Sequence, residues 1–278
     1  MFTQVVVGWD GSPNADAALR WAAERSDEEP LRLVHAVAVP AAEEPGSRAR
    51  LAPDDEAAGF LERIEGLRAT HPNRVVSAQT VHGRAEKVLG SCVAHDALVV
   101  VGASQSGHET AWTLGARLAG RRGSGTVAVI PPDWDVATRR GIVVGVDGSD
   151  EAQAAIRVGV EEAARTGEPL ELLHAWVVPT SWNSAYVEYL GDVSLMEEMR
   201  HDLLDAAVEY ARSIGGDPTG RLERGAAAPI LAEASETARL VVVGSHAAGG
   251  MVRFLLGSVS HDLLLSAAGP VVVVGEAG

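Results

Sequence analysis

Short blocks rich in aliphatic residues alternate along the chain with longer stretches in which apolar residues recur every three or four positions. In the first part of the chain the blocks are residues 5–7, 31–37, 75–81, 97–101 and 127–130. Blocks that consist mainly of aliphatic residues are typical of strands that are covered on both faces. The stretches between them predict helices, at residues 15–25, 55–69 and 85–94. The alternation predicts an α/β fold with a parallel sheet and helices on both faces, because each crossover is right-handed and lays its helix against the sheet.

The same order of elements begins again at Ile142, so the chain is a tandem repeat. The segment IVVGVDGS at 142–149 matches VVVGWDGS at 5–12. Further on, LLHAW matches LVHAV, and LVVVG occurs once in each half. A repeat that spans a whole set of strands and helices indicates two copies of one domain. We expect one domain at residues 1–132 and another at 141–278, joined by a polar, proline-led segment.

The stretch LVVVGSHAAGGMVRFLLGSV, at 240–259, carries the candidate chemistry of the second copy. A predicted strand ends at Gly244, a glycine-bearing loop follows, and Gly257 and Ser258 open an apolar-periodic segment that predicts a helix. Glycines let a backbone approach a ligand, the amides at a helix start point outward, and the Ser258 hydroxyl adds a donor. The stretch therefore predicts an anion site at the carboxyl edge of the sheet. The alternative is an ordinary strand–loop–helix turn without a ligand.

The spacing Gly244-x2-Ala247-x9-Gly257-Ser258 resembles the nucleotide-binding signature Gly-x2-Gly-x9-Gly-Ser/Thr of the universal stress protein family. With the repeat, this resemblance covers essentially the whole chain and implies a tandem member of the family. It also implies two doubly wound parallel sheets, each of five strands in the order 3-2-1-4-5. Ala247 departs from the signature. If that position requires a positive φ, alanine costs roughly 1–2 kcal/mol; if it requires only a small side chain, alanine is tolerated.

The resemblance implies an adenine nucleotide at the carboxyl edge of the second sheet: ATP, with or without Mg²⁺. Asp147, within Gly145-Val146-Asp147, would contact the adenine or ribose side, and Ala175 would line the adenine pocket. The residues expected around the ribose and phosphates are Val243, Gly244, Ala247, Gly257, Ser258 and Val259. The protein implied is a regulatory stress-response protein.

The first half of the chain matches the signature less well. There Gln105 stands at the second motif position, and Gly115 and Ala116 stand at the last two. The long side chain of Gln105 replaces a glycine, and Ala116 lacks the hydroxyl, a hydrogen bond worth about 0.5–3 kcal/mol. Asp10 and Gly102 are kept. We expect the C-terminal half to hold the nucleotide and the N-terminal half to bind it weakly or not at all.

Composition and charge exclude several other classes of protein. The formal net charge of −15 and the scattered arginines disfavour a nucleic-acid partner. The single cysteine, Cys92, excludes an internal disulfide, and we expect it to be a small buried residue of the predicted helix 85–94. No run approaches the ~20 apolar residues of a membrane span. The first residues lead straight into a strand without a signal-type block, so we expect a cytoplasmic location.

Catalytic motifs are absent from the sequence. There is no Gly-x4-Gly-Lys-Ser/Thr loop, no Gly-x-Ser-x-Gly elbow, and residues 145–148 do not form a Gly-x-Gly-x-x-Gly fingerprint. His35 and His174 recur inside predicted strands, where we expect satisfied core residues. His246 and Arg253 either approach the phosphates or remain solvated. At most slow ATP hydrolysis is expected, and the alternatives to a nucleotide binder are a protein-interaction module and a slow nucleotidase.

The fifth strands offer a further expectation, taken from the family resemblance. In the family these strands pair across a twofold axis. Residues 127–130 and 271–274 would then pair within one chain as a pseudo-dimer, which could dimerise again as a homodimer. The sequence does not identify a protein partner.

Overall fold

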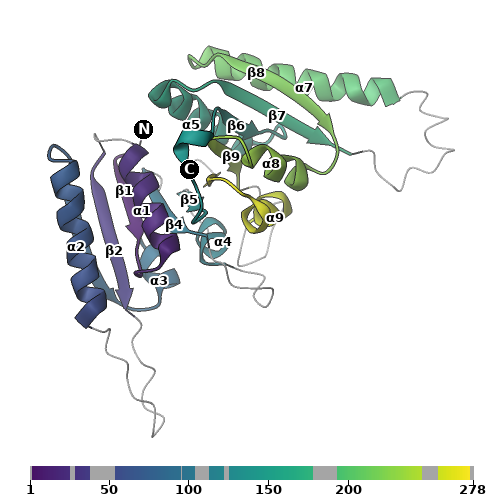
Figure 1. Cartoon of the computed structure of the whole chain (residues 1–278). Helices are drawn as coiled ribbons and strands as arrows, with labels where there is room; N and C mark the ends of the chain where they lie inside the picture. The colour runs from purple at the N-terminus through teal and green to yellow at the C-terminus, as the bar shows by residue number, and fades with distance from the viewer. Residues whose placement is uncertain are drawn as a thin grey trace, which may run out of the picture. The chain divides into compact units, whose positions relative to one another are not determined.

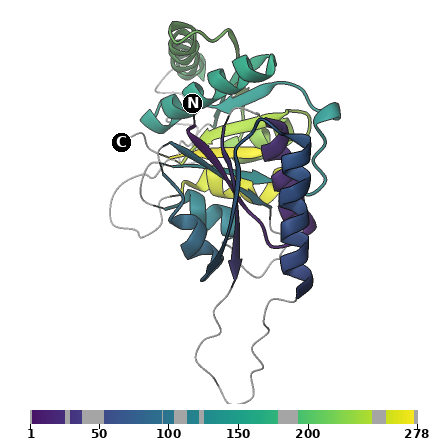
Figure 2. The same cartoon turned by 90° about the vertical axis from the view of Figure 1, so that its left-hand side faces the viewer.

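The computed structural model of the chain describes residues 2–25, 29–37, 54–94, 96–103, 113–121, 125–177, 193–245 and 256–275. These residues divide into two compact units, one that runs as far as Trp134 and one that starts at Asp135. Figure 1 shows the elements of both units, and Figure 2 shows the same ribbon from another side.

The N-terminal unit contains one parallel sheet with helices on both faces. Its described elements are β1 (Gln4–Gly8), α1 (Pro13–Arg25), β2 (Leu31–Val37), α2 (Asp54–Thr70), β3 (Val76–His82), α3 (Ala85–Gly90), β4 (Ala97–Gly102), α4 (Leu114–Ala119) and β5 (Thr126–Ile130). The strands lie in the order β3-β2-β1-β4-β5, and all their pairings are parallel. In Figure 2 the purple α1 and dark blue α2 cover one face, and α3 and α4 the other.

The C-terminal unit repeats this arrangement. Its described elements are η1 (Val136–Thr138), β6 (Ile142–Gly145), α5 (Asp150–Thr166), β7 (Leu170–Trp176), α7 (Val193–Ser213), β8 (Pro218–Arg224), α8 (Ala227–Ser235), β9 (Leu240–Gly244), α9 (Ser258–Ser266) and β10 (Val271–Val274). The order is β8-β7-β6-β9-β10, again parallel throughout. Figure 1 shows α5 and α7 on one side of the sheet and α8 and α9 on the other.

Both sheets confirm the predicted fold class and the predicted strand order 3-2-1-4-5. The aliphatic blocks of β1, β4, β6 and β9 are buried, as expected for strands covered on two faces. β3 exposes most of its residues, and in β8 every residue except Pro218 is exposed or half-buried.

The repeated Asp-Gly-Ser segment builds the turn between the first strand and the first helix of each unit. Oδ1 of Asp147 accepts hydrogen bonds from the amide (3.0 Å) and the hydroxyl (2.6 Å) of Ser149, and Gly148 adopts φ +86°. The Ser149 hydroxyl in turn accepts from the Ala152 amide (3.1 Å) and caps α5. The same bonds occur at Asp10 and Ser12. The repeated aspartate therefore has a structural task, whatever else it does.

The structure corrects the end of one predicted helix. We predicted a helix at 85–94, but α3 ends at Gly90. The hydroxyl of the next residue, Ser91, donates to the Val88 carbonyl (2.7 Å), a local bond that competes with helix continuation. Cys92 lies in the turn beyond the helix and is half-buried, so the prediction of a buried helical cysteine was wrong.

The segment that precedes β6 is held to the C-terminal unit by Arg139. Its guanidinium donates to two backbone carbonyls, those of Ser235 and Ala268, the latter at 2.9 Å. The Arg140 amide also donates, to the Thr237 carbonyl (2.9 Å). The polar segment that the sequence marks as a junction is therefore bonded to the residues that precede β9 and β10.

Glu168 provides a second anchor for this segment. Its carboxylate, only 5% exposed, accepts from the Gly141 amide (2.9 Å) and lies near the guanidinium groups of Arg140 (3.3 Å) and Arg239 (3.4 Å). The Gly141 amide, and after it the two arginines, hold the pKa of Glu168 below its ordinary value, although burial raises that pKa. Ionised Glu168 therefore stabilises the folded protein.

We predict that Glu168→Gln lowers the free energy of unfolding by about 1–2 kcal/mol at pH 7, because a hydrogen bond to a charged group is lost and Arg140 is too exposed to add much. The pKa of Glu168 is lower in the folded state, so its contribution is complete above the unfolded value of about 4.3 and is lost as the pH falls below it. Urea unfolding at several pH values should show the two proteins converging in acid.

Glu171→Gln is the matched control. Glu171 faces Arg221 at 3.2 Å, and about a third of each side chain is exposed, so a loss below about 1 kcal/mol is expected. A deficit in Glu168→Gln that is the same at acidic and neutral pH would contradict the assigned role of the carboxylate.

Candidate functional site

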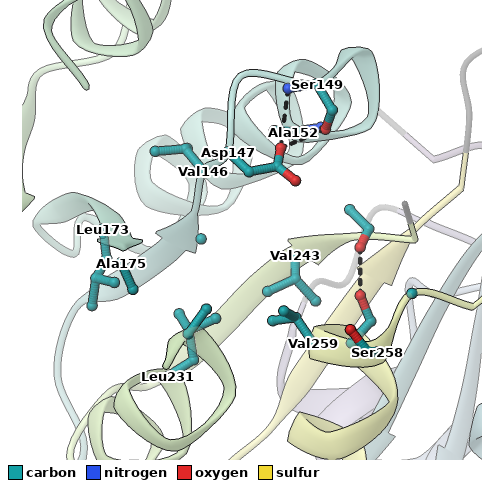
Figure 3. A pocket seen from close by; sticks show the side chains of 15 residues that line it. Val146, Asp147, Ser149, Ala152, Leu173, Ala175, Leu231, Val243, Ser258 and Val259 are labelled. Carbon is teal, nitrogen blue, oxygen red and sulfur yellow. Dashed lines mark hydrogen bonds between the residues drawn. The ribbon is translucent and has the colours of Figure 1, made fainter. Parts of the chain in front are cut away.

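A pocket of about 130 Å³ opens at the carboxyl edge of the C-terminal sheet (Figure 3). It lies where the strand order reverses, since β6 is flanked by β7 on one side and by β9 on the other. Open parallel sheets bind ligands in this crevice, because the helices that follow the two central strands leave on opposite faces. The lining comes from the ends of β6, β7 and β9 and from the starts of α5, α8 and α9.

The structure brings together nine residues that the sequence singled out for the C-terminal site. They are Gly145, Val146, Asp147, Ala175, Val243, Gly244, Gly257, Ser258 and Val259. Ala247, His246 and Arg253 lie outside the described residues. The lining also includes residues that were not predicted, namely Ser149, Ala152, Leu173, Ala227, Leu231 and Ser260.

One side of the pocket is apolar. Leu173 and Ala175 project from β7, Leu231 from α8 and Val243 from β9 (Figure 3). Leu173, Leu231 and Val243 are each almost fully buried. Small and aliphatic side chains of this kind form a surface on which a planar heterocyclic ring can lie.

Asp147 supplies the polar group at the opposite side of the pocket. It is exposed, and Figure 3 shows its carboxylate at the pocket edge, with Oδ1 bonded to Ser149. In the described part of the chain no donor reaches its second oxygen, Oδ2. That oxygen can accept a hydrogen bond from a ligand hydroxyl or amino group while Oδ1 continues to hold the turn.

The start of α9 presents backbone amides to the pocket. Gly257 is the N-cap residue and has no side chain to cap the helix, and the first backbone bond of the helix joins the His261 amide to the Gly257 carbonyl (2.9 Å). The amides of the three residues between them find no acceptor among the described residues, as is general for a first helical turn. Ser260 holds this turn in place by donating to the Gly244 carbonyl (2.7 Å). The exposed Ser258 adds a hydroxyl donor.

The positive charge that the pocket offers to an anion comes from these amides and not from a cationic side chain. Asp147 is the one ionisable side chain among the described lining residues. A helix start carries roughly half a positive charge and binds anions through its free N–H groups. The arrangement can thus accept an anionic group near Ser258 and a hydroxyl or amino group near Asp147.

Gly244 has a packing reason to be glycine, apart from any ligand. A Cβ atom there would lie 2.8 Å from the carbonyl carbon of Glu151, in the first turn of α5. A Cβ atom at Gly102 would lie even closer to the backbone carbonyl of Asn14 in α1. The first glycine of the signature therefore allows a helix to touch the end of the strand, and the remaining motif residues carry the evidence for a ligand.

The N-terminal unit has a corresponding pocket of about 310 Å³, lined by Asp10 and Gly102 among others. Its larger volume shows that space is not what separates the two sites. The helix start differs: α4 begins at Leu114, and the Thr113 hydroxyl caps it by accepting from the Ala116 amide (3.2 Å). The Ala116 amide therefore already has an acceptor and is not free to bind a ligand. Gln105 lies outside the described residues.

Two negative findings apply to the described part of the chain. It contains no group of three or more His, Cys, Asp or Glu side chains placed to hold a metal ion. None of its helices combines the length and apolar character that a membrane crossing requires.

The fold and the two pockets define a doubly wound α/β protein with a crevice at the carboxyl edge of each sheet. The sequence pattern of the universal stress protein family matches residues 1–116 and 138–275. The chain therefore belongs to the universal stress protein family, and the resemblance seen in its motif is confirmed.

Individual relatives match over nearly the full length. Universal stress protein Rv2623 of Mycobacterium tuberculosis is 31% identical over 292 residues, which cover 98% of this chain and 96% of the relative. Universal stress protein Rv2005c of the same organism is 32% identical over 305 residues, with 98% and 97% covered. The crystal structure of a universal stress protein from Archaeoglobus fulgidus has a TM-score of 0.68 at 15% identity, covering 99% of this chain and 98% of that one. At that identity the structural match bears on the fold alone.

We predict that Gly244→Ala destabilises the protein by about 1–3 kcal/mol, because the new methyl group must displace the first turn of α5. Gly66→Ala is the control. Gly66 lies in the exposed face of α2 with no atom within 4 Å of an added Cβ, so alanine there should stabilise by about 0.5–1 kcal/mol. Urea unfolding measures both changes. A Gly244→Ala protein as stable as the natural one would mean that the helix start does not depend on this glycine.

Proposed function

We propose that this tandem universal stress protein binds ATP in the pocket of its C-terminal unit and acts as a regulatory protein in a stress response. The observation that carries the proposal is the uncapped start of α9, which faces a pocket with an apolar wall and a carboxylate. The apolar wall suits adenine, Asp147 suits a ribose hydroxyl or the adenine amino group, and the amides at 258–260 suit the phosphates.

The energetics of such a site depend on short-range hydrogen bonds. The net charge of −15 repels a polyanion at long range, but salt screens exposed charges beyond about 8 Å at physiological ionic strength. Each hydrogen bond to a charged phosphate oxygen contributes about 1.5–3 kcal/mol. Several free amides and the Ser258 hydroxyl therefore outweigh the distant repulsion. Mg²⁺ bound with ATP would take its ligands from the phosphates and water.

The same reasoning supports one tight site in each chain. In the N-terminal pocket Thr113 occupies a helix-start amide, and Ala116 has no hydroxyl. We therefore propose weak or absent nucleotide binding there. Domain boundaries at residues 132 and 141, a cytoplasmic location, pairing of the fifth strands and a homodimer stay as predictions.

A regulatory role is proposed over an enzymatic one because the described pocket has no lysine, arginine or histidine in its lining. Efficient phosphoryl transfer needs cations or positioned donors for the charge that develops in the transition state. At most slow hydrolysis is expected, and release of inorganic phosphate by the purified protein tests for it.

Calorimetric titration of the intact chain with ATP tests the proposal. The natural protein should show close to one tight site, and thermal unfolding should gain about 2.7 kcal/mol when ATP is present at a hundred times its dissociation constant. Ser258→Ala should weaken binding about 10- to 150-fold, the loss of one neutral donor to a charged acceptor worth about 1.5–3 kcal/mol. Ser266→Ala, at the other end of α9, is the control and should bind ATP normally.

Gly257→Asp separates binding from folding. An aspartate at the N-cap accepts hydrogen bonds from the helix-start amides and should maintain stability or raise it by about 0.5 kcal/mol. The same carboxylate occupies and repels the phosphate position, so binding should weaken at least about 30-fold. Equal ATP affinity in Gly257→Asp and the natural protein would refute the C-terminal assignment. No binding to any of these proteins would favour an interaction module instead.

A further inference from the structure

His174 occupies an unusual position beside the pocket. It lies on β7 between Leu173 and Ala175, and because side chains alternate along a strand, it projects from the face opposite these two pocket residues. The ring is 4% exposed, and its Nδ1 lies 2.7 Å from the Val146 carbonyl oxygen at the end of β6. His174 therefore contacts the backbone of the pocket from behind.

This contact identifies Nδ1 as a hydrogen-bond donor. A carbonyl oxygen only accepts hydrogen bonds, so Nδ1 must carry a proton and donate it to the Val146 carbonyl. Nε2 is buried and has no hydrogen-bond partner among the described residues. An unsatisfied polar atom in a core opposes stability. An aliphatic residue would avoid that cost, so the advantage of histidine here lies in the bond to Val146.

The bond sets the orientation of the peptide that joins Val146 to Asp147. A trans peptide is planar, and its carbonyl and amide groups point in opposite directions. Since the Val146 carbonyl is turned toward His174, behind the pocket, the Asp147 N–H is turned toward the pocket side. This N–H donates to none of the described residues. It lies next to the Asp147 carboxylate and is free to bond an acceptor atom of a ligand.

The N-terminal unit uses the matching histidine differently. His35 packs against the ring of Trp9, with centroids 6.0 Å apart, and against Phe60 at 5.5 Å. No hydrogen bond from His35 to the Trp9 carbonyl occurs among the described residues, and Trp9 replaces Val146. Two histidines at equivalent places therefore make different contacts, and only His174 holds the backbone of its pocket.

We infer that His174 is a positioning residue of the C-terminal site: through its bond to Val146 it directs the Asp147 N–H at an acceptor atom of the bound nucleotide. This inference rests on the proposed function. His174 does not touch the ligand, so its effect on binding passes entirely through the Val146–Asp147 peptide.

Two conservative substitutions test this inference. The side-chain amide of asparagine can place its N–H where Nδ1 lies, whereas that of glutamine reaches the position of Nε2. His174→Asn should bind ATP within about 3-fold of the natural protein, and His174→Gln should bind about tenfold more weakly, which is the loss of one hydrogen bond. His35→Gln is the matched control and should bind normally. Dissociation constants come from calorimetry, and unfolding temperatures are measured without ligand.

The outcomes separate this inference from the proposed function. If the natural protein does not bind ATP, the proposed function fails and the inference with it. If it binds, and His174→Gln binds as tightly, the inference alone is overturned. Equal weakening in both His174 variants, in step with their unfolding temperatures, also overturns it and leaves a purely structural histidine. Long-range ¹H–¹⁵N spectra of the natural protein add a readout that needs no variant to fold: an Nε2-protonated tautomer of His174 would exclude the bond.

Discussion

The reversal of strand order beside the first strand of each sheet is the constraint on which the rest of the structure depends. In the C-terminal unit the chain leaves β6 toward β7 with its helices on one face, and returns to β9 with its helices on the other. Backbone must therefore diverge at the carboxyl ends of β6 and β9, and a crevice opens there. Gly244 and the Asp-Gly-Ser turn then determine how closely α5 approaches that crevice. The presence of a pocket is a consequence of topology, and its chemistry depends on a few side chains.

The two units show how small the difference is between a crevice with an uncapped helix start and one with a capped helix start. Both keep the turn-forming aspartate, the close-packed glycine and a pocket. They differ where the helix after the fourth strand begins. Gly257 has no side chain to cap the first turn of α9, whereas the Thr113 hydroxyl caps the first turn of α4. A self-capped helix is more stable, and it has fewer free donors for a phosphate. Stability and ligand binding compete for the same amides.

Most of the fold could be predicted from the sequence because its determinants are local. Aliphatic blocks such as residues 5–7 predict buried strands, and the recurrence of Asp-Gly-Ser predicts the same turn in both units. The motif residues of β6, β9 and α9 do converge in one pocket, because strand ends and a helix start must lie at one edge of a parallel sheet. The spacing of the motif residues in the sequence was therefore sufficient to predict that they line one pocket.

The remaining features depend on contacts that no local pattern encodes. Leu231 and Ala227 reach the pocket from α8, a crossover helix whose placement is decided by packing, although the small residues that follow β8 were a usable signal. The early end of α3 at Gly90 is accompanied by a hydrogen bond from the Ser91 hydroxyl to the Val88 carbonyl. His174 was expected to be a satisfied core residue, but Nε2 is unsatisfied and Nδ1 bonds the pocket backbone. The bond from His174 to Val146 depends on the register of β6 against β7, which a local sequence pattern does not encode.

The chemistry of the pocket also bears on the proposal that the protein binds a nucleotide without turning it over efficiently. A catalyst must stabilise the transition state more than the bound substrate, which for phosphoryl transfer means donors or cations aimed at charge that develops during the reaction. Amides in the first turn of α9 are fixed by the Ser260 bond to Gly244 and would hold the phosphates of a bound nucleotide as they stand. Donors that serve the ground state and the transition state equally lower the dissociation constant without raising the rate. A pocket whose described lining offers amides, hydroxyls and one carboxylate is thus suited to retaining a nucleotide, and retention is the property that a regulatory protein needs.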